Sequence, residues 1–360
     1  MMRRYYVFLI FLLAPILAAV MLTKSYYDDP QLSDSITKAY EYEITDLDPI
    51  DYSLTGAELR VKPLIESLTY LEETIQDYVK NFAMFEAALK SSISSSSQLR
   101  LLSDDIYEKR ITKALGQPID FYLSTKVEIK LFTLSELDYR GYIAKVKLFN
   151  PYIFKLELAQ GKVGGLETTT DAAERTGAIL TINGGGFDKV SKDGETVSVM
   201  NGNTVVDGNL VNPFVVPDSE HLFFVGTDKY GNLIGGRPNS EKELFALNPY
   251  QGASFLPILI QNGEKTTLPI LWQNNKHPRT IIGDYSNNDL ILIVIDGRQS
   301  DWSNGITLER LQDKLIELGV KNAYNLDGGG STSMYFKGEV LNRPSDGFLR
   351  PVANHFIIAP

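Results

Sequence analysis

The sequence contains no cysteine, which excludes disulfide bonds, thiolate nucleophiles and cysteine-ligated zinc. Histidine is nearly as scarce, since the 360 residues include only His221, His277 and His355. A zinc site built from imidazoles would need all three, and the H-E-x-x-H spacing of zinc hydrolases is absent. Catalytic chemistry in this chain must therefore depend mainly on Asp, Arg and Asn side chains.

Several nucleotide-binding and hydrolase signatures are also absent. The sequence has neither the G-x-G-x-x-G fingerprint of dinucleotide-binding proteins nor the G-x-x-x-x-G-K-[ST] phosphate loop. It lacks a G-x-S-x-G elbow, which argues against Ser331 as the nucleophile of a serine hydrolase. Acidic residues outnumber basic ones, 45 to 35, which argues against nucleic acid as a partner. A local basic pocket for one phosphate group is compatible with this balance.

The amino terminus carries the one long apolar run. Tyr5 to Leu22 contains no charged residue and follows Arg3 and Arg4. We interpret residues 1–24 as a membrane anchor or signal segment, because the run reaches the lower length limit for crossing a bilayer. The basic flank predicts a single-pass protein of the cell membrane with its C-terminal body outside the cytoplasm. If the segment is cleaved instead, the body would be secreted, although no good small-x-small cleavage site follows the run.

Residues 25–125 are predicted to form a helical linker or stalk. Eight apolar residues follow alternating steps of four and three, namely Leu64, Leu68, Leu71, Ile75, Tyr78, Phe82, Phe85 and Leu89. This heptad pattern predicts a helix over 64–89 that either forms a homodimer with a second copy or packs on the protein's own body. The serine-rich run 91–97 predicts a turn or boundary before a second helical stretch near 99–115.

From residue 126 to the end, the pattern changes to short strands. Apolar and polar residues alternate in "VEIKLFTL" and "YIAKVKLF", and glycine turns separate the later apolar runs. One amphipathic helix is predicted at 307–318, with Thr307 as N-cap and Gly319 at its end. Many strands with few helices predict an α+β fold, built on a mixed or antiparallel sheet and preceded by the helical stalk and the transmembrane helix.

Four segments in this region join an apolar strand to a polar or glycine-rich turn. They are "TINGGGFD" at 181–188, "HPRTIIG" at 277–283, "LILIVIDGRQSDWSNGIT" at 290–307 and "AYNLDGGGSTSMYF" at 323–336. Glycine triplets let backbone N–H groups approach an anion closely, and arginine offers forked contacts to a phosphate. A strand-end Asp is costly to bury without a partner. Together the segments predict one polar pocket at a sheet edge, with two acids, two arginines and two glycine loops.

These segments and the closing "RPVANHFII" at 350–358 resemble, in this order, the phosphodiester glycosidase family. The family includes a lysosomal enzyme that removes N-acetylglucosamine from a sugar phosphodiester, and bacterial members related to exopolysaccharide synthesis. The resemblance covers about 127–360 and implies a mixed α/β catalytic domain over 126–360. One departure is the extra glycine in "NGGGF", where relatives often read Asn-Gly-Gly-Phe-Phe, which leaves the role of Asp188 open.

The resemblance implies hydrolysis at the anomeric carbon of a sugar joined to phosphate. We expect four catalytic residues, Arg279, Arg298, Asp296 and Asp327. The arginines would hold the phosphate, and the two carboxylates would stabilise the sugar cation, act as nucleophile or activate water, with their individual roles open. The substrate-binding residues are expected to be Asn183, Gly184, Gly185, Gly186, His277, Asn325, Gly328, Gly329, Gly330, Ser331 and Thr332.

The sequence therefore predicts an extracytoplasmic hydrolase of sugar-1-phosphodiester bonds in a cell-envelope or exopolysaccharide glycan, a teichoic-acid-type polymer being one candidate. Two alternatives are a non-catalytic protein that binds an anionic glycan during envelope assembly, and an amidase-like enzyme that processes peptidoglycan. No cofactor is assigned. Asp188, Asp284 and Asp289 are candidate calcium ligands, although no complete calcium loop is present.

Overall fold

The computed structural model describes residues 54–192, 194–217, 222–272 and 274–360. The predicted membrane or signal segment, 1–24, and the stretch 25–53 lie outside the described residues. Within the described ranges, no helix is both long and apolar enough to cross a bilayer. By its internal contacts the chain divides into two compact units, residues 1–99 and 100–360.

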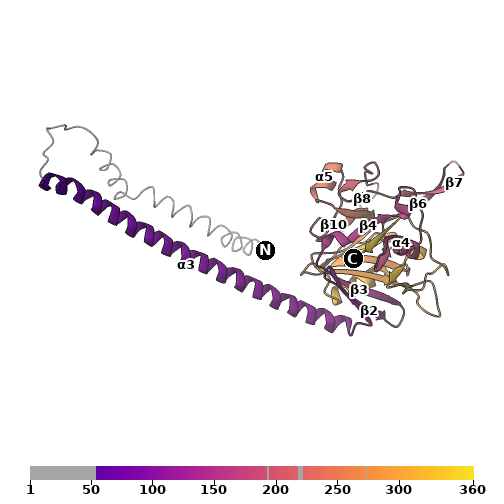
Figure 1. Cartoon of the computed structure of the whole chain (residues 1–360). Coiled ribbons are helices and arrows are strands. Elements are labelled where there is room, and N and C mark those ends of the chain that lie inside the picture. The colour runs from indigo at the N-terminus through magenta and orange to yellow at the C-terminus, as the bar shows by residue number, and fades with distance from the viewer. Residues whose placement is uncertain (1–53, 193, 218–221, 273) are drawn as a thin grey trace. The chain divides into compact units, whose positions relative to one another are not determined.

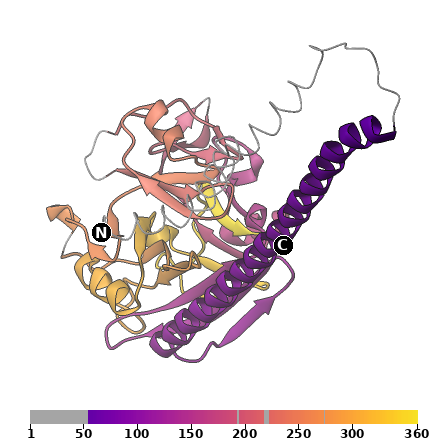
Figure 2. The same cartoon turned by 90° about the vertical axis from the view of Figure 1, so that its left-hand side faces the viewer.

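A single unbroken helix, α3 (Leu54–Leu115), contains the predicted heptad pattern (Figure 2). The heptad residues with described side chains are between 49% and 70% exposed, namely Leu68, Leu71, Ile75, Tyr78, Phe82 and Phe85. The predicted interruption at 91–97 is wrong, because the helix continues through these residues. Serine disfavours a helix by only about 0.5 kcal/mol per residue relative to alanine, and it lacks the steric block of proline.

The last turns of α3 belong to the core of the second unit. Ile111 is 3% exposed and packs in an apolar cluster with strand residues. The buried Lys145 donates to Glu108 of the helix at 2.6 Å and to Asp289 at 2.5 Å. Glu108 also pairs with Lys130. Because a buried ammonium group is costly without such partners, these contacts hold the end of α3 against the sheet.

The second unit is built from three sheets and a hairpin (Figure 1). The eight-stranded sheet has the order β1 (Asp120–Leu123), β2 (Val127–Ser135), β3 (Arg140–Leu148), β16 (Leu290–Ile295), β15 (Arg279–Asp284), β17 (Asn322–Leu326), β13 (Ile258–Gln261) and β14 (Glu264–Lys265). One five-stranded sheet has the order β19 (Glu339–Val340), β18 (Met334–Phe336), β5 (Leu180–Asn183), β20 (Asn354–Ile358) and β4 (Phe154–Leu158). The other has the order β11 (Leu233–Gly236), β10 (Phe223–Thr227), β12 (Gln251–Phe255), β8 (Val205–Val206) and β9 (Asn209–Leu210).

The remaining elements are short. Strands β6 (Phe187–Lys192) and β7 (Glu195–Met200) form the separate hairpin, and the α-helices are α4 (Thr169–Thr176), α5 (Glu241–Ala246) and α6 (Leu308–Glu317). The 3₁₀ helices are η1 (Pro151–Ile153), η2 (Ala159–Gly161), η3 (Ile270–Trp272) and η4 (Gly329–Ser331). The strand pairs of the described residues are antiparallel, which confirms the α+β prediction. Thr307 caps α6 as predicted, by accepting a hydrogen bond from the amide of Arg310.

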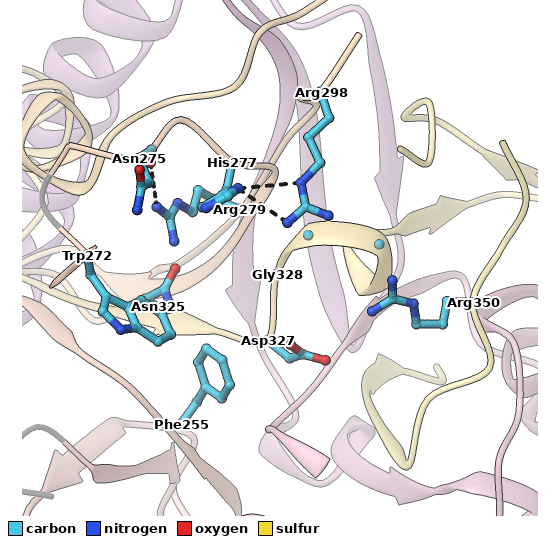
Figure 3. Close-up of a pocket in the computed structure, with 12 residues that line it drawn as sticks. Phe255, Trp272, Asn275, His277, Arg279, Arg298, Asn325, Asp327, Gly328 and Arg350 are labelled. Atoms are coloured by element: carbon cyan, nitrogen blue, oxygen red, sulfur yellow. Dashed lines mark hydrogen bonds between the residues drawn. The ribbon is translucent and has the colours of Figure 1, made fainter. Parts of the chain in front are cut away.

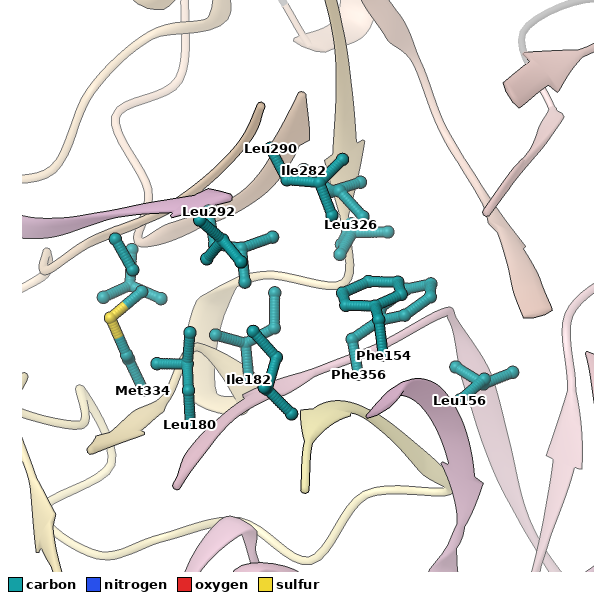
Figure 4. Packing of buried hydrophobic residues seen from close by; sticks show 14 of the residues in the cluster. Phe154, Leu156, Leu180, Ile182, Ile282, Leu290, Leu292, Leu326, Met334 and Phe356 are labelled. Atoms are coloured by element: carbon teal, nitrogen blue, oxygen red, sulfur yellow. The ribbon is translucent and has the colours of Figure 1, made fainter. Parts of the chain in front are cut away.

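Apolar clusters cover both faces of the central strand β16, whose six residues are all buried. One face of the sheet, including Ile282, Leu290 and Leu292, packs on β5, β20 and β4, where Phe154 and Phe356 stack with ring centroids 5.5 Å apart (Figure 4). The other face packs on α6 and Ile111. Burial on two faces explains the uninterrupted apolar run "LILIVI", which alternation alone would not predict.

The topology brings the polar segments to one edge. In the antiparallel register, Arg279 at the start of β15 lies opposite Ile295 at the end of β16. The next residue, Thr280, lies opposite Leu326 at the end of β17. The turns at 277–279, 296–298 and 327–330 therefore leave the sheet side by side. Asn183 ends β5 of the neighbouring sheet and reaches the same edge, since its side chain donates to the carbonyl of Asp327.

Candidate active site

A pocket of about 310 Å³ lies where these turns meet (Figure 3). It is lined by Phe255, Trp272, Asn275, His277, Arg279, Arg298, Asn325, Asp327, Gly328, Gly329, Gly330 and Arg350. Three of the four expected catalytic residues are in this lining, and Asp327 is its single acid. The pocket therefore combines several cationic groups with one carboxyl group.

Arg279 and Arg298 supply positive charge to the pocket. Within the described part of the chain, neither guanidinium forms an ion pair with a carboxylate. Arg279 is only 4% exposed and donates to two backbone carbonyls, those of Asn275 at 3.0 Å and Ile306 at 3.4 Å. Burial, with a smaller contribution from Arg298, lowers the pKa of Arg279 to about 10. The group is still charged at neutral pH, and an anion in the pocket would stabilise it.

His277 orients the second arginine. The Arg298 side chain donates to Nδ1 of His277 from Nη2 at 3.2 Å and from Nε at 3.4 Å (Figure 3). Arginine has no acceptor atom, so Nδ1 must accept, and the neutral imidazole carries its proton on Nε2. Burial and the two nearby guanidinium groups lower the pKa of His277. His277 is therefore a neutral support for Arg298.

Asp327 lies at the start of the second glycine loop and is half-buried. Burial raises its pKa to about 6, against the opposing effects of the Ser331 hydroxyl, the Gly328 amide and the charge of Arg350. Its backbone is fixed by two hydrogen bonds. The N–H of Asp327 donates to the carbonyl of Gly184 at 3.2 Å, and its carbonyl accepts from the side chain of Asn183 at 2.5 Å. This carboxyl group changes charge within the physiological range and does so at a fixed position.

The second glycine loop provides close approach to its neighbours. Gly329 has φ +60°, and a Cβ there would lie 3.1 Å from Nη2 of Arg298. The amide of Gly329 donates to the carbonyl of Pro278 at 3.0 Å, and those of Ser331 and Thr332 donate within the loop. These three amides are therefore not available as the expected anion cradle. The positive potential of the pocket comes mainly from arginine side chains.

The first glycine loop does not line the pocket. Its amides donate to protein acceptors, Gly184 to the carbonyl of Asn354, Gly185 to the Asn354 side chain and Gly186 to the carbonyl of Ser254. Glycine is required because these backbones pack closely, and a Cβ at Gly186 would lie 2.6 Å from the ring of Phe255. The loop packs against residues that line the pocket, such as Phe255, but is not itself part of the lining. The substrate contacts expected for Gly184, Gly185 and Gly186 are therefore not supported by their position.

Asn183, Ser331 and Thr332 are also buried behind the lining. Asn183 holds the carbonyl of Asp327, and its Oδ1 accepts from Thr280 at 2.7 Å. Asn325 differs from these three, because it lines the pocket. Its Nδ2 donates to the carbonyl of Leu256, whereas its buried Oδ1 has no hydrogen-bond donor among the described residues. Asn325 is therefore placed to accept a hydrogen bond from a ligand.

The expectation that Asp296 takes part in catalysis is not supported by its position. Asp296 is 1% exposed and absent from the lining, and its carboxylate accepts hydrogen bonds from Trp302, Asn342 and Arg343. Burial raises its pKa, although these three donors oppose the shift. Both strand-end acids reach the same sheet edge, but only the side chain of Asp327 faces the pocket. Asp296 is bound within the protein.

The candidate calcium ligands lie apart from one another. Asp188 is exposed on the β6–β7 hairpin. Asp284 ends β15 at the edge opposite the pocket and accepts from Asn322, and Asp289 pairs with Lys145. The described residues contain no group of three or more Asp, Glu, His or Cys side chains that would hold a metal ion. The structure therefore does not support calcium binding by these three residues.

Sequence reasoning missed four residues of the lining, namely Phe255, Trp272, Asn275 and Arg350. Phe255 and Trp272 form an apolar wall, with ring centroids 6.2 Å apart at 67°. Arg350 pairs with Asp346 at 2.7 Å beside Gly330. Arg350 stands at the start of the closing "RPVANHFII" segment, and the resemblance of this segment to the family implies no role for the arginine. The aromatic pair carried no such signal, because both residues lie outside the recognised segments.

Comparison with known proteins identifies the family. The family model described as Phosphodiester glycosidase matches residues 176–359, slightly more than half of the chain. The chain is 30% identical over 195 residues to N-acetylglucosamine-1-phosphodiester alpha-N-acetylglucosaminidase of Mus musculus, covering 50% of this chain and 36% of the mouse protein. It is also 30% identical over 201 residues to the SPbeta prophage-derived uncharacterized protein YomE of Bacillus subtilis (strain 168), covering 54% and 30%. The chain thus spans about a third of the length of these relatives.

A solved structure supports the fold. The zebrafish N-acetylglucosamine-1-phosphodiester alpha-N-acetylglucosaminidase catalytic domain, auto-inhibited by pro-peptide, aligns with a TM-score of 0.53 at 23% identity. The alignment covers 66% of this chain and 84% of that one. Antiparallel sheets with an arginine-lined pocket at their strand ends define an α+β protein with a positively charged site. The chain belongs to the phosphodiester glycosidase family, which confirms the family predicted from its five motifs.

Proposed function

We propose that this pocket hydrolyses the bond between the anomeric carbon of a sugar and a phosphodiester oxygen. The observation that carries the proposal is the position of Asp327 beside Arg279 and Arg298, neither of which has a carboxylate partner within the described part of the chain. A pocket with two such guanidinium groups favours an anion, and a phosphodiester accepts forked contacts from arginine. Family membership supports the reaction class.

The arginines bind the phosphate and stabilise its departure. When the glycosidic bond breaks, its electron pair moves to the phosphate oxygen, and a phosphodiester monoanion becomes a phosphomonoester with more negative charge. Guanidinium groups already fixed by His277 and by backbone carbonyls lose little conformational freedom as they meet this charge. They therefore contact the transition state more strongly than the substrate.

The opposite side of the pocket suits a sugar ring. Phe255 and Trp272 present an apolar wall on which the C–H face of a sugar packs. The Oδ1 of Asn325 has no donor from the described residues and accepts a hydrogen bond from a sugar hydroxyl. A sugar placed between this wall and the arginines has its anomeric carbon near Asp327.

Asp327 acts in its charged form. The phosphate leaving group is already acidic, so it needs no proton from the enzyme, and a single carboxylate is sufficient. Asp327 either removes a proton from water, whose oxygen then bonds to the anomeric carbon, or attacks that carbon itself before water releases the sugar. Both routes yield the free sugar and a phosphomonoester, and both require the deprotonated carboxyl group.

The pH dependence follows from this requirement. The value of kcat/KM is expected to rise as pH increases through about 6 and then level off, because Asp327 loses its proton there. An ordinary Asp would place this limb about two pH units lower. Initial rates from pH 4 to 8 at constant ionic strength measure it. The limb should persist in His277→Gln; a fall in rate over the same range would show that the protonated acid is active.

The direct test of the function uses the full-length protein and a glycosyl phosphodiester. UDP-N-acetylglucosamine and methyl N-acetylglucosamine-1-phosphate are expected to release free sugar, whereas p-nitrophenyl N-acetylglucosaminide, which lacks phosphate, should react far more slowly. In ¹⁸O-labelled water, cleavage at the anomeric carbon places the label in the sugar. Label in the phosphate would show attack at phosphorus. Binding without release of any product would favour the non-catalytic, glycan-binding alternative.

We also propose that the substrate is a sugar-phosphate glycan of the cell envelope, acted on outside the cytoplasm. The support is the apolar run Tyr5 to Leu22, which lies outside the described residues, together with the acidic composition of the chain. Protease added to intact cells should remove an epitope tag placed at the C-terminus. Protection of that tag would contradict this location.

The exposed heptad face of α3 supports self-association. The pattern spans more than three heptads, which is typical of a coiled coil, so we propose that the 64–89 helix pairs with a second copy. Phe82→Glu places a charge in this seam and is expected to convert the dimer to a monomer. Met84→Glu is the matched control, because Met84 is 64% exposed but lies off the seam. Light scattering after gel filtration measures the mass; an unchanged mass for Phe82→Glu would contradict the proposal.

A further inference from the structure

The buried carboxylate of Asp296 joins separate segments of the chain. Its Oδ2 accepts from Nε1 of Trp302 at 2.7 Å. Its Oδ1 accepts from the side chain of Asn342 at 3.0 Å and from the backbone N–H of Arg343 at 2.9 Å. We call these four residues the Asp296 frame. They connect the turn after β16 to the loop after β19.

The first connected segment, 296–304, carries Arg298. Arg298 has φ +60°, a conformation that a residue with a side chain adopts only when its surroundings hold it there. The turn is closed by the Ser303 hydroxyl, which donates to the carbonyl of Asp296 at 2.6 Å, and by paired backbone bonds between Gln299 and Ser303. The hydrogen bond from Trp302 to the Asp296 carboxylate is a further link between the two ends of this turn. The direction of the Arg298 side chain therefore depends on this closure.

The second connected segment, 342–350, carries Arg350 into the pocket. Besides the bond from Arg343 to Asp296, the side chain of Gln299 donates to the carbonyls of Arg343 and Pro344 at 3.2 and 3.1 Å. The guanidinium of Arg343 also lies over the Trp302 ring, 5.8 Å from its centroid. The loop that ends at Arg350 is thus attached at its start to the turn that holds Arg298.

Asn342 adds a third segment, the one that follows Asp327. Its Nδ2, which donates to Asp296, also donates to the carbonyl of Thr332 at 3.1 Å. Its Oδ1 accepts from the amide of Met334 at 2.8 Å. One buried carboxylate is therefore linked, directly or through Asn342, to all three segments that carry Arg298, Arg350 and Asp327.

We propose that Asp296 is a positioning residue that sets the two arginines at the anion side of the pocket. A carboxylate is needed because all three of its partners are donors, and only a carboxylate offers acceptors alone. In Asp296→Asn, a side-chain NH₂ would face at least one N–H group, so one bond of the frame must break. The proposal deepens the function proposed above and rests on it for its kinetic readout, but not for its binding readout.

The experiment compares Asp296→Asn with Asp301→Asn in the full-length protein. Asp301 is in the same turn but is exposed, with a weak contact to Arg343 at 3.3 Å, and makes a matched control. Asp296→Asn is expected to weaken the binding of inorganic phosphate, measured by calorimetry, about tenfold, and to raise KM more than it lowers kcat. Asp301→Asn should remain within about twofold of the original protein in both.

A spectroscopic readout reports the frame itself. The chain has only two tryptophans, so an ¹⁵N–¹H spectrum contains two indole N–H signals. The Trp302 signal should shift in Asp296→Asn and remain in place in Asp301→Asn, because only Asp296 accepts its bond. Should Asp296→Asn fail to fold, Trp302→Phe removes one bond of the frame and keeps the ring. The expected loss of phosphate affinity is then smaller, about threefold.

The outcomes separate this inference from the proposed function. A folded Asp296→Asn or Trp302→Phe protein that binds phosphate within twofold of the original would overturn the positioning role. A lower kcat with unchanged phosphate affinity would also overturn the positioning role, and it would indicate that Asp296 takes part directly in the reaction. If the original protein binds phosphate but releases no sugar, the proposed function fails, and the role of Asp296 is still decided by the phosphate affinities.

Discussion

Asp327→Asn is expected to reduce kcat/KM for a sugar-1-phosphodiester by at least about 10³-fold, with little change in KM. Asp327 is the single acid of the pocket lining, and the amide that replaces it can neither accept a proton from water nor attack the anomeric carbon. Steady-state assays of released sugar measure the effect. If kcat/KM of Asp327→Asn stays within tenfold of that of the original protein, Asp327 is not a catalytic residue.

The same substitution is expected to stabilise the fold above pH 6. Because burial raises the pKa of Asp327 from 3.8 to about 6, the folded protein binds this proton more tightly than the unfolded chain does. Ionisation therefore costs stability progressively as pH rises from about 4 to 6, and the full cost, roughly 1 to 3 kcal/mol, applies above that range. An uncharged amide removes the cost, so thermal unfolding at pH 7.5 should show a Tm that is unchanged or higher.

Asp284→Asn is the matched control for this pair of effects. Asp284 is also a buried strand-end acid whose pKa burial raises to about 6, but it lies at the opposite end of β15 from the pocket. Its substitution should change the dependence of stability on pH in the same direction and leave kcat/KM within about twofold. Equal losses of activity in both variants would point to a general defect of folding.

Arg279→Met should lower kcat/KM by about 10² to 10³-fold, because the developing charge on the phosphate loses a buried, forked donor. Arg279→Lys keeps the charge without the fork, and an intermediate loss of about tenfold is expected. Arg237→Met, at an exposed arginine elsewhere in the chain, should behave as the original protein. The measurement is the same sugar-release assay under subsaturating substrate.

Arg279→Met should not reduce the thermal stability of the protein, although it lowers kcat/KM. Because burial lowers the pKa of Arg279 to about 10, its charge is less favourable in the folded protein than in the unfolded chain. An apolar side chain of similar length should therefore leave Tm unchanged or raise it. Inorganic phosphate should raise the Tm of the original protein and have a smaller effect on the variant. A large fall in Tm without phosphate would indicate that Arg279 is needed for the fold.

The sequence predicted the edge at which the site forms. Arg279, Arg298 and Asp327 each follow or begin an apolar strand, and the antiparallel pairing of β15 with β16 and β17 places those strand ends together. The sequence did not predict which side chains face the pocket. Asp296 has the same strand–Asp–Gly pattern as Asp327, but its turn directs the carboxylate to Trp302. That choice depends on loop contacts with residues near 342, which no local pattern encodes.

Other parts of the site depend on tertiary contacts between distant residues. Phe255 and Trp272 meet across a loop, and Arg350 lies in a loop whose start accepts a hydrogen bond from the side chain of Gln299. The glycine triplet at 184–186 has the composition of an anion cradle, yet its amides are already bonded to Asn354 and Ser254. Composition indicates that a backbone can approach a partner closely, but it does not indicate whether that partner is a ligand or the protein.

The attachment of Lys145 to Glu108 has a consequence for where the catalytic body begins. The family match starts at residue 176, and the strand-rich sequence starts at about residue 126. The buried Lys145 nevertheless has one of its two carboxylate partners, Glu108, in the helix that precedes both. A shorter protein starting at residue 126 would lose that carboxylate together with Ile111, exposing apolar sheet surface and leaving Asp289 alone opposite the lysine. Expression of a stable catalytic fragment should therefore retain the chain from about residue 100 onward.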